Sequence, residues 1–595
     1  TDFHASIALA RAATVAGAPI TPRAPDLQLS GLVPEISLSL RNDISTVSLA
    51  DLDASGFYKP DRARSPSAFE QIRKRIGRAS LTPNQLEALK QESPQAYEVF
   101  GQDGAIQDTA SPMVMPNLSA YFRGEGSGDQ IAVGEPVYIP PDPTGEIGPY
   151  HYVQAVNTTF GVFATAFGNR NLGPLKVNAL FAGFGGPCET TNDGDPIVQY
   201  DQLSDRWLIS QFALPNIDSN AGPFYQCIAI STTGDPMATW YRYQFLFDNT
   251  LLNDYTKFGV WPDAYYATVN LFEYPGSIFR GMAAIAYERD KMLAGLPARQ
   301  VVFKLNNQPS PINKIAGALP SDLDGMRLPP AGAPNIIAAP EAAEWTFYPT
   351  DRIHFFKFHV DWTTPANSTF SGPVDVETAP WNSLCDQTRA CVPQNGTAVT
   401  LDAISDRFMY RLAYRNFGDY QSLVANQTVH AGDGRAGVRW YEIRAPHAIT
   451  PTIYRQSTYA PSDGLWRWMG SAAQDRRGNL TLGFSASGSG IYPTIRVTGR
   501  LYGDPVNTLV QGEAEMVTAG GSQTSSAHRW GDYSHMSLDP RDDCTFWYTN
   551  EYYYYGSSNS DWLTYIAAFK YPSCDTALTA GLSGTVASLA TGLPI

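Results

Sequence analysis

One strand–turn–strand pattern recurs along this chain and constrains the fold more than any other feature. In its last copy, residues 529–556, a segment that begins at Ser534 leads into a turn at Asp539–Asp543 and then into an aromatic strand. Asp and Pro favour turns, and aromatic residues favour strands. Similar copies begin near residues 151, 197, 264, 335, 403 and 469, so most copies start 65 to 71 residues after the one before.

A repeat of this length has room for about four strands, which is typical of a β-propeller blade. One such sheet cannot bury both of its faces, whereas a closed ring of sheets can. The sequence therefore predicts an all-β fold, a seven-bladed β-propeller with a partly helical N-terminal arm. A pair of β-sandwiches is the alternative, and a ring of six or eight blades would be a smaller departure.

The repeats set the expected domain boundaries: an arm or pro-segment over 1–129, the propeller over 130–574 and an extension over 575–595. Within the arm, residues 4–16, 65–77 and 81–94 have helix-like patterns, the last with Thr82 as N-cap and Pro83 in the first turn. We expect the arm to brace the main domain, with an inhibitory lid as the alternative.

The formal charge of −15 and a pI near 5.0 argue against nucleic acid and anionic lipid as partners. Neutral sugars, cations and basic proteins stay open. No apolar run reaches the roughly 20 residues of a membrane helix. Because Thr1 is not an initiator methionine, we expect a removed leader and a secreted, extracellular protein.

Six cysteines allow three disulfides, and local pairing is the simplest arrangement. It predicts the pairs Cys188–Cys227, Cys385–Cys391 and Cys544–Cys574. None of these cysteines forms a CxxC metal motif.

Residues 140–163, PPDPTGEIGPYHYVQAVNTTFGVF, carry a pattern of the form PPDxxGxxGPxHYVQxVN. With YDQLSDRWLISQFA, KFGVWPDAYYATVN and RWGDYSHMSLDPRDDCTFWYTNEY further on, the chain resembles a largely uncharacterised group of exported microbial β-propeller-like proteins over about residues 131–574. The resemblance implies a propeller fold and export, and it assigns no catalytic residue.

In a propeller, the loops before the inner strands gather at one mouth of the central channel, where sites usually lie. These loops are rich in Trp and Asp, and Trp261–Pro–Asp263 matches Trp530–Gly–Asp532. We expect ligand binding by Trp261, Trp468, Trp530, Tyr533 and Arg529. The alternative is that these Trp residues pack between blades and that each Asp caps its own turn.

Two carboxylates could act as acid and base on a glycosidic bond, so Asp263, Asp532 and His528 are the candidate catalytic residues. Asp142 and Asp195 are the candidate metal ligands, with Ca²⁺ as the possible cofactor. Arg411 and Arg415 could bind an acidic sugar or form internal ion pairs.

The sequence thus predicts a secreted propeller that binds a glycan or another extracellular ligand at its mouth. Two alternatives remain: a glycoside hydrolase or polysaccharide lyase that uses the same mouth, and a structural or surface-assembly protein. No G-x-S-x-G elbow, HExxH or P-loop occurs to favour another enzyme class.

Overall fold

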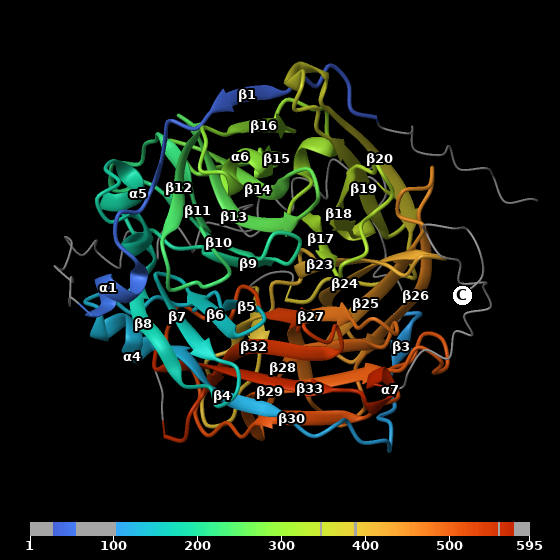
Figure 1. The fold of residues 1–595 in the computed structure, drawn as a ribbon. Coiled ribbons are helices and arrows are strands. Elements are labelled where there is room, and N and C mark those ends of the chain that lie inside the picture. The colour runs from blue at the N-terminus through green and yellow to red at the C-terminus, as the bar shows by residue number, and fades with distance from the viewer. Residues whose placement is uncertain (1–27, 55–102, 346–347, 386–388, 557–559, 576–595) are drawn as a thin grey trace, which may run out of the picture.

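The computed structural model describes residues 28–54, 103–345, 348–385, 389–556 and 560–575, and Figure 1 shows that they form a propeller-like arrangement of β-sheets. The all-β class that the sequence predicts is confirmed. The three helices predicted at 4–16, 65–77 and 81–94 and most of the extension over 575–595 lie outside the described residues.

Most strands belong to antiparallel groups of four. Their bounds are β5 (Thr144–Ile147), β6 (His151–Val156), β7 (Thr159–Ala164) and β8 (Arg170–Lys176); β9 (Ile197–Asp201), β10 (Arg206–Ala213), β11 (Phe224–Ser231) and β12 (Trp240–Asp248); β13 (Leu251–Val260), β14 (Tyr265–Glu273), β15 (Ile278–Tyr287) and β16 (Arg299–Lys304); β17 (Leu319–Asp324), β18 (Asn335–Glu341), β19 (Arg352–His359) and β20 (Thr369–Glu377); β23 (Met409–Asn416), β24 (Gln421–His430), β25 (Ala436–Arg444) and β26 (Thr452–Tyr459); β27 (Trp466–Gln474), β28 (Leu480–Gly488), β29 (Ile491–Arg500) and β30 (Glu513–Val517); and β31 (His535–Leu538), β32 (Thr545–Tyr553) and β33 (Trp562–Lys570) with β4 (Ala120–Gly126).

The first strands of the groups lie side by side around a centre. Each first strand contacts the next one around the ring. The order of neighbours is β5, β9, β13, β17, β23, β27 and β31, and β31 contacts β5 again. Figure 1 shows β9, β13, β17 and β23 near the middle, with β8, β12, β20, β26 and β30 toward the rim. Two groups also share one nine-stranded sheet, because β17 and β23 pair in parallel through Ser321–Leu412 and the residues that follow.

The last group is completed by a strand from the start of the described chain. β4 pairs antiparallel with β33, with Phe122 opposite Ile566. Although β4 lies within the arm predicted over 1–129, it is therefore part of a four-stranded sheet. This pairing brings residues 120–126 and residues 535–570 into the same group.

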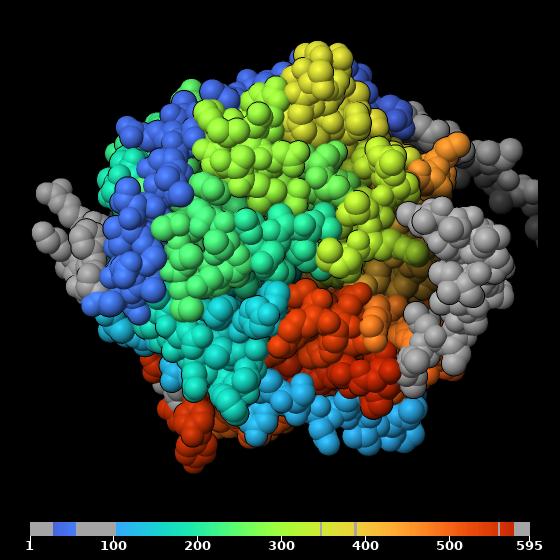
Figure 2. Space-filling view, viewed as in Figure 1, coloured from blue at the N-terminus to red at the C-terminus, as the bar shows by residue number. Residues whose placement is uncertain are grey.

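Three more strands of the arm run along the rim, namely β1 (Glu35–Leu38) beside β16, β2 (Arg41–Ile44) beside β12 and β3 (Ile106–Gln107) beside β26. Arg242 holds β2 through a two-pronged ion pair with Asp43, at 2.7 Å for each nitrogen–oxygen contact. Buried Asp103 binds Arg439 and Thr458 next to β3. On the face in Figure 2, the dark blue residues of the arm lie along the rim, and the brace interpretation stays a prediction.

Short helices and one small sheet connect these strands. The helices are α1 (Leu49–Ala54), α4 (Ser127–Ala132), α5 (Pro187–Thr190), α6 (Arg289–Leu293) and α7 (Pro572–Asp575), and 3₁₀ turns occupy Val177–Phe181, Ile217–Ser219, Ile312–Lys314, Ala343–Trp345 and Pro365–Asn367. β21 (Ala390–Val392) and β22 (Leu401–Asp402) form the small sheet.

The cysteines and the acidic turn follow the sequence-based predictions. Cys188–Cys227, Cys385–Cys391 and Cys544–Cys574 form disulfides, so local pairing is confirmed. The turn at Asp539–Asp543 joins β31 to β32, where Asp542 accepts hydrogen bonds from the backbone N–H groups of Cys544 and Thr545, both at 2.9 Å. An Asp side chain that caps its own turn is the reason that Asp favours such positions.

The starts of three repeats fall on second strands rather than first strands. Residues 151, 264 and 335 lie at β6, β14 and β18, whereas the first strands of those groups are β5, β13 and β17. β13 contains Asn253, Asp254 and Lys257, and its register shifts between Asp254 and Lys257. Polar residues that face inward and a β-bulge hide such a strand from a search for alternating apolar residues.

Candidate site at the mouth of the strand ring

The loops that lead into the first strands define one face, which we call the mouth. Asp142, Asp195 and Asp532 each lie two or three residues before a first strand, β5, β9 or β31. All three have left-handed backbones, with φ of 52°, 49° and 65°. Asp tolerates this conformation better than most residues, so the repeated aspartates have a local reason to be there.

The structure brings these three predicted aspartates into one network. The backbone N–H of Asp142 donates to the carbonyl of Gly531 at 3.0 Å. The N–H of Tyr255 donates to the Asp195 carboxylate at 3.2 Å, and its hydroxyl donates to the carbonyl of Asp532 at 3.1 Å. Because Tyr255 lies on β13, the four groups that begin with β5, β9, β13 and β31 are tied together at the mouth.

Lys257 lies at the centre of this network and was not among the predicted site residues. Its ammonium group is 3.6 Å from the ring centre of Tyr255 and 3.9 Å from that of Tyr533, and it donates to the carbonyl of Thr256 at 3.1 Å. Burial lowers the pKa of Lys257 to about 8, although Asp195, Asp142, Asp254 and Asp532 oppose that shift. The available sequence signal was a Lys between aromatic residues, Tyr255 and Phe258, in an inner strand.

Ion pairs with partial exposure surround the buried lysine. Arg529 pairs with Asp532, and Arg407 pairs with Asp406 at 2.8 Å while its guanidinium lies 4.5 Å from the ring centre of Tyr255. The side chains of Asp532 and Asp406 are 14% and 17% exposed. These two carboxylates are the more exposed parts of the ion pairs, since the side chains of Arg529 and Arg407 are only 9% and 4% exposed.

His528 belongs to the edge of the same mouth. Its carbonyl accepts a hydrogen bond from the N–H of Asp402 at 2.7 Å, and its ring nitrogen Nδ1 lies 2.8 Å from the carbonyl oxygen of Thr400. Asp402 also pairs with Arg389 at 2.9 Å and lies 3.5 Å from Arg529. The small β21–β22 sheet therefore links His528 to the ion pairs of the mouth.

Trp261 and Asp263 lie elsewhere, and their predicted equivalence with Trp530 and Asp532 is wrong. They occupy the turn between β13 and β14, at the far end of a first strand, whereas Trp530 and Asp532 precede one. Asp263 accepts a hydrogen bond from Trp362 through its carbonyl at 2.7 Å, and burial raises the pKa of its carboxyl to about 6. The two Trp-x-Asp segments therefore lie on opposite faces. The sequence analysis placed the start of the third repeat at β14, one strand after the first strand of that group.

The three predicted sugar-stacking tryptophans are buried. Trp468 and Trp530 pack against each other at 5.8 Å between ring centres, and Trp261 packs on Tyr414 at 4.8 Å. Trp530 also donates its indole N–H to Ser485 at 3.0 Å. In this structure the three indole rings pack between groups of strands. Stacking on a ligand stays a prediction, and it would require these rings to become exposed.

A second polar cluster lies deeper, along the first strands. Arg411 of β23 pairs with Asp322 at 3.1 Å and with Asp324, both on β17. Burial raises the pKa of Asp322 to about 6, and it raises that of Glu146 on β5 well above its usual range. Arg411 therefore forms an internal ion pair, which is the alternative interpretation from the sequence, with Asp as its partner.

His535, at the start of β31, is fixed as a neutral group in this cluster. The backbone N–H of Gly145 donates to its Nδ1 at 3.2 Å, so the ring proton resides on Nε2. Burial, and next the charge of Arg411, lower its pKa well below the usual value. Its role here is that of a hydrogen-bond acceptor.

Within the described residues, no group of three or more His, Cys, Asp or Glu side chains is arranged to hold a metal ion. Asp142 and Asp195 bind protein groups in the mouth network, as described above. Calcium at these two aspartates stays a prediction.

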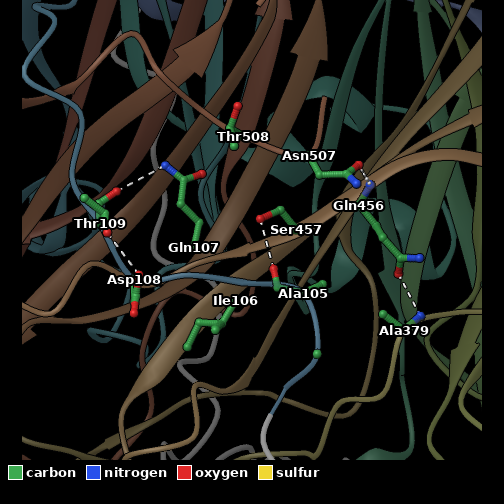
Figure 3. Close-up of a pocket in the computed structure, with 11 residues that line it drawn as sticks. Ala105, Ile106, Gln107, Asp108, Thr109, Ala379, Gln456, Ser457, Asn507 and Thr508 are labelled. Atoms are coloured by element: carbon green, nitrogen blue, oxygen red, sulfur yellow. Dashed lines mark hydrogen bonds between the residues drawn. The ribbon is translucent and has the colours of Figure 1, made fainter. Parts of the chain in front are cut away.

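A pocket of about 520 Å³ lies at the rim, where the arm meets β26 (Figure 3). Ser457 donates to the carbonyl of Ala105 at 3.0 Å, and Asn507 accepts from the N–H of Gln456 at 3.0 Å. Gln107 donates to the carbonyl of Leu509 at 2.9 Å. These polar groups hold the arm and its neighbours in place, away from the mouth.

No protein-family model matches this chain, and no curated protein matches it. Among solved structures, it is similar to an endo-arabinase from Bacteroides thetaiotaomicron (15% identity, 52% of this chain and 95% of that chain, TM-score 0.27) and to a PL25 ulvan lyase (11%, 76% and 96%, TM-score 0.31). It is also similar to Drosophila Semaphorin 1b (8%, 76% and 87%, TM-score 0.36). At these values the similarities carry no argument about what this chain does.

The helices of the described residues are all too short or too polar to cross a membrane.

Proposed function

We propose that the four-stranded groups are the seven blades of one closed ring and that its mouth binds a glycan outside the cell. The closed cycle of contacts among the first strands supports the ring. The three disulfides favour an oxidising compartment, in line with secretion.

The observation that carries the binding proposal is the pairing of partly exposed carboxylates with guanidinium groups beside them, around a buried ammonium group. Asp532 and Asp406 present oxygen acceptors, while Arg529 and Arg407 present nitrogen donors beside them. A sugar hydroxyl both donates and accepts, so it can bridge such pairs without a net charge on the ligand. Hydrogen bonds to charged groups contribute about 1.5–3 kcal/mol each, which is enough for specific recognition.

Calorimetric titration with a panel of neutral and acidic oligosaccharides tests this proposal. We expect Asp532→Asn and Arg529→Gln each to weaken binding by about tenfold or more, as the loss of one charged hydrogen bond implies. Asp433→Asn is the matched control, because Asp433 pairs with Arg435 at 2.7 Å on the same face but farther from the centre. Binding that is unchanged in both mouth variants, or no binding by any oligosaccharide, would contradict the proposal.

A second candidate function is a carbohydrate-active enzyme, and the pKa of Lys257 favours it. Acid–base catalysis requires groups that change protonation near the working pH, and Lys257 has a pKa of about 8. In this scheme Asp532 contacts the substrate and Lys257 holds a proton beneath it. Assays of polysaccharide cleavage test it, because Lys257→Met should abolish a cleavage that wild-type protein performs while glycan binding persists.

A further inference from the structure

A groove of about 420 Å³ lies on the face opposite to the mouth, next to β4 and β32. The turn between β7 and β8 contributes Thr165, the start of β4 contributes Ser119 and Ala120, and the β31–β32 turn contributes Asp539, Arg541 and Asp542. These segments come from the β5–β8 group and from the group that β4 completes. The groove therefore exists because β4 closes that group.

Trp547, which lines this groove, carries an unused hydrogen-bond donor. The side chain is 2% exposed, and its ring centre lies 5.5 Å from that of Tyr152 and 6.3 Å from that of Phe122. Its indole N–H has no acceptor among the described residues. The nitrogen is shielded from solvent, so Trp547 forms part of the wall of the groove and its N–H does not serve as a ligand contact.

Carboxylates outnumber cations at the edge of the groove. Arg541, whose side chain is 49% exposed, pairs with Asp539 at 2.6 Å. Asp542 accepts a hydrogen bond from the Thr545 hydroxyl at 2.7 Å and lies 3.6 Å from Lys570, which also donates to Asp575 at 2.8 Å. Three carboxylates thus lie near one guanidinium and one ammonium group. This excess of negative charge disfavours an anionic ligand and is compatible with an uncharged polar one.

Two exposed aromatic residues lie near the groove, one next to a lining residue in the chain and one near Arg541 in space. Phe167 follows Ala166, which lines the groove, and it is 84% exposed. Tyr150 is 75% exposed and lies close enough to Arg541 to interact with it electrostatically. Exposed rings next to hydrogen-bonding groups offer an apolar face to one side of a sugar ring and polar partners to its edge.

We propose that this groove is a second binding site for an uncharged sugar unit, with Tyr150 and Phe167 as stacking platforms and Arg541 as a hydroxyl partner. Its volume falls within the range of about 300–1,000 Å³ that is usual for small-ligand pockets. The site is independent of the mouth, because it lies on the other face and uses none of the same residues.

Hydroxyl-radical footprinting of the full chain, with cellohexaose, xylohexaose, arabinohexaose and mannohexaose as probes, tests the site directly. We expect at least one probe to protect Tyr150 and Phe167 from oxidation. Protection confined to the mouth would overturn this inference and leave the proposed function intact. Protection confined to the groove would support this inference and would count against glycan binding at the mouth. No protection with any of the four probes overturns it.

Variants measured by calorimetry separate binding from folding. Arg541→Gln should weaken binding of the protecting probe by about tenfold, the usual effect of losing a charged hydrogen bond. Tyr150→Ser removes one proposed stacking ring at a position that is 75% exposed, so it should also weaken binding while the melting temperature stays within a few degrees. Arg280→Gln is the matched control, because Arg280 is 44% exposed and pairs with Glu273 outside the groove. Equal affinity in all three variants overturns the inference.

Discussion

Lys257 should make the stability of this protein rise with pH in a range where most proteins lose stability. Burial lowers its pKa from 10.5 to about 8. Between these two values the unfolded state holds a proton on Lys257 that the folded state has released, so alkali favours folding. A shift of this size, at roughly 1.4 kcal/mol for each pH unit, corresponds to about 3 kcal/mol.

Replacing Lys257 by Met isolates this contribution, because Met has a similar length and no charge. We expect wild-type stability relative to Lys257→Met to increase by about 3 kcal/mol between pH 7 and pH 10.5. Guanidinium chloride unfolding of both proteins across that range, at constant ionic strength, measures it. The difference between them removes the titration of tyrosines and other groups, which both proteins share.

Lys570→Met provides a control with the opposite sign. A hydrogen bond with Asp575 raises the pKa of Lys570, so its contribution to stability is lost as pH rises. If the difference in unfolding free energy between wild type and Lys257→Met is constant from pH 7 to 10.5, burial does not lower the pKa of Lys257. The proposed role of Lys257 in proton transfer would then be wrong as well.

Three further outcomes follow from the structure. Asp103→Asn should destabilise the protein by about 3 kcal/mol and expose the arm to limited proteolysis, because it leaves the buried charge of Arg439 unpaired; an unchanged cleavage pattern would contradict this. Removing the Cys544–Cys574 disulfide by a double Ser substitution should lower the free energy of unfolding by about 2–4 kcal/mol, measured by thermal unfolding. It should also weaken the binding of a ligand to the groove on the opposite face, since Cys544 precedes Thr545, which lines that groove. Wild-type protein should lose stability as pH rises from about 4 to 6, because the raised pKa of Asp263 makes the folded state bind an extra proton in that range. Asp263→Asn should not show this loss, and its glycan binding at the mouth should be unchanged.

The fold was accessible from the sequence wherever strands alternate or turns are capped. The hairpin of β31 and β32 illustrates this, because its apolar alternation and its Asp-rich turn are both local. β13 and β17 were missed as first strands, since their polar residues, such as Lys257 and Asp322, face partners on other strands. Long-range ion pairs of this kind cannot be seen from one segment alone.

The candidate site was accessible in part. Asp142, Asp195 and Asp532 were found because a left-handed turn before a first strand selects the same residue type in several repeats. Trp261 could not be placed correctly, because residue type does not tell the start of a strand from its end. Nor does it tell a buried packing ring from an exposed one, as Trp530 shows.

The pairing of β4 with β33 affects how the protein is made. Glu125 accepts a hydrogen bond from Thr564, a residue 439 positions later. At a synthesis rate of about 5–20 residues per second, the ribosome needs roughly 20–90 s between these two residues. Throughout that interval β4 lacks its sheet partner, so a nascent chain must keep this strand from pairing elsewhere until β33 emerges.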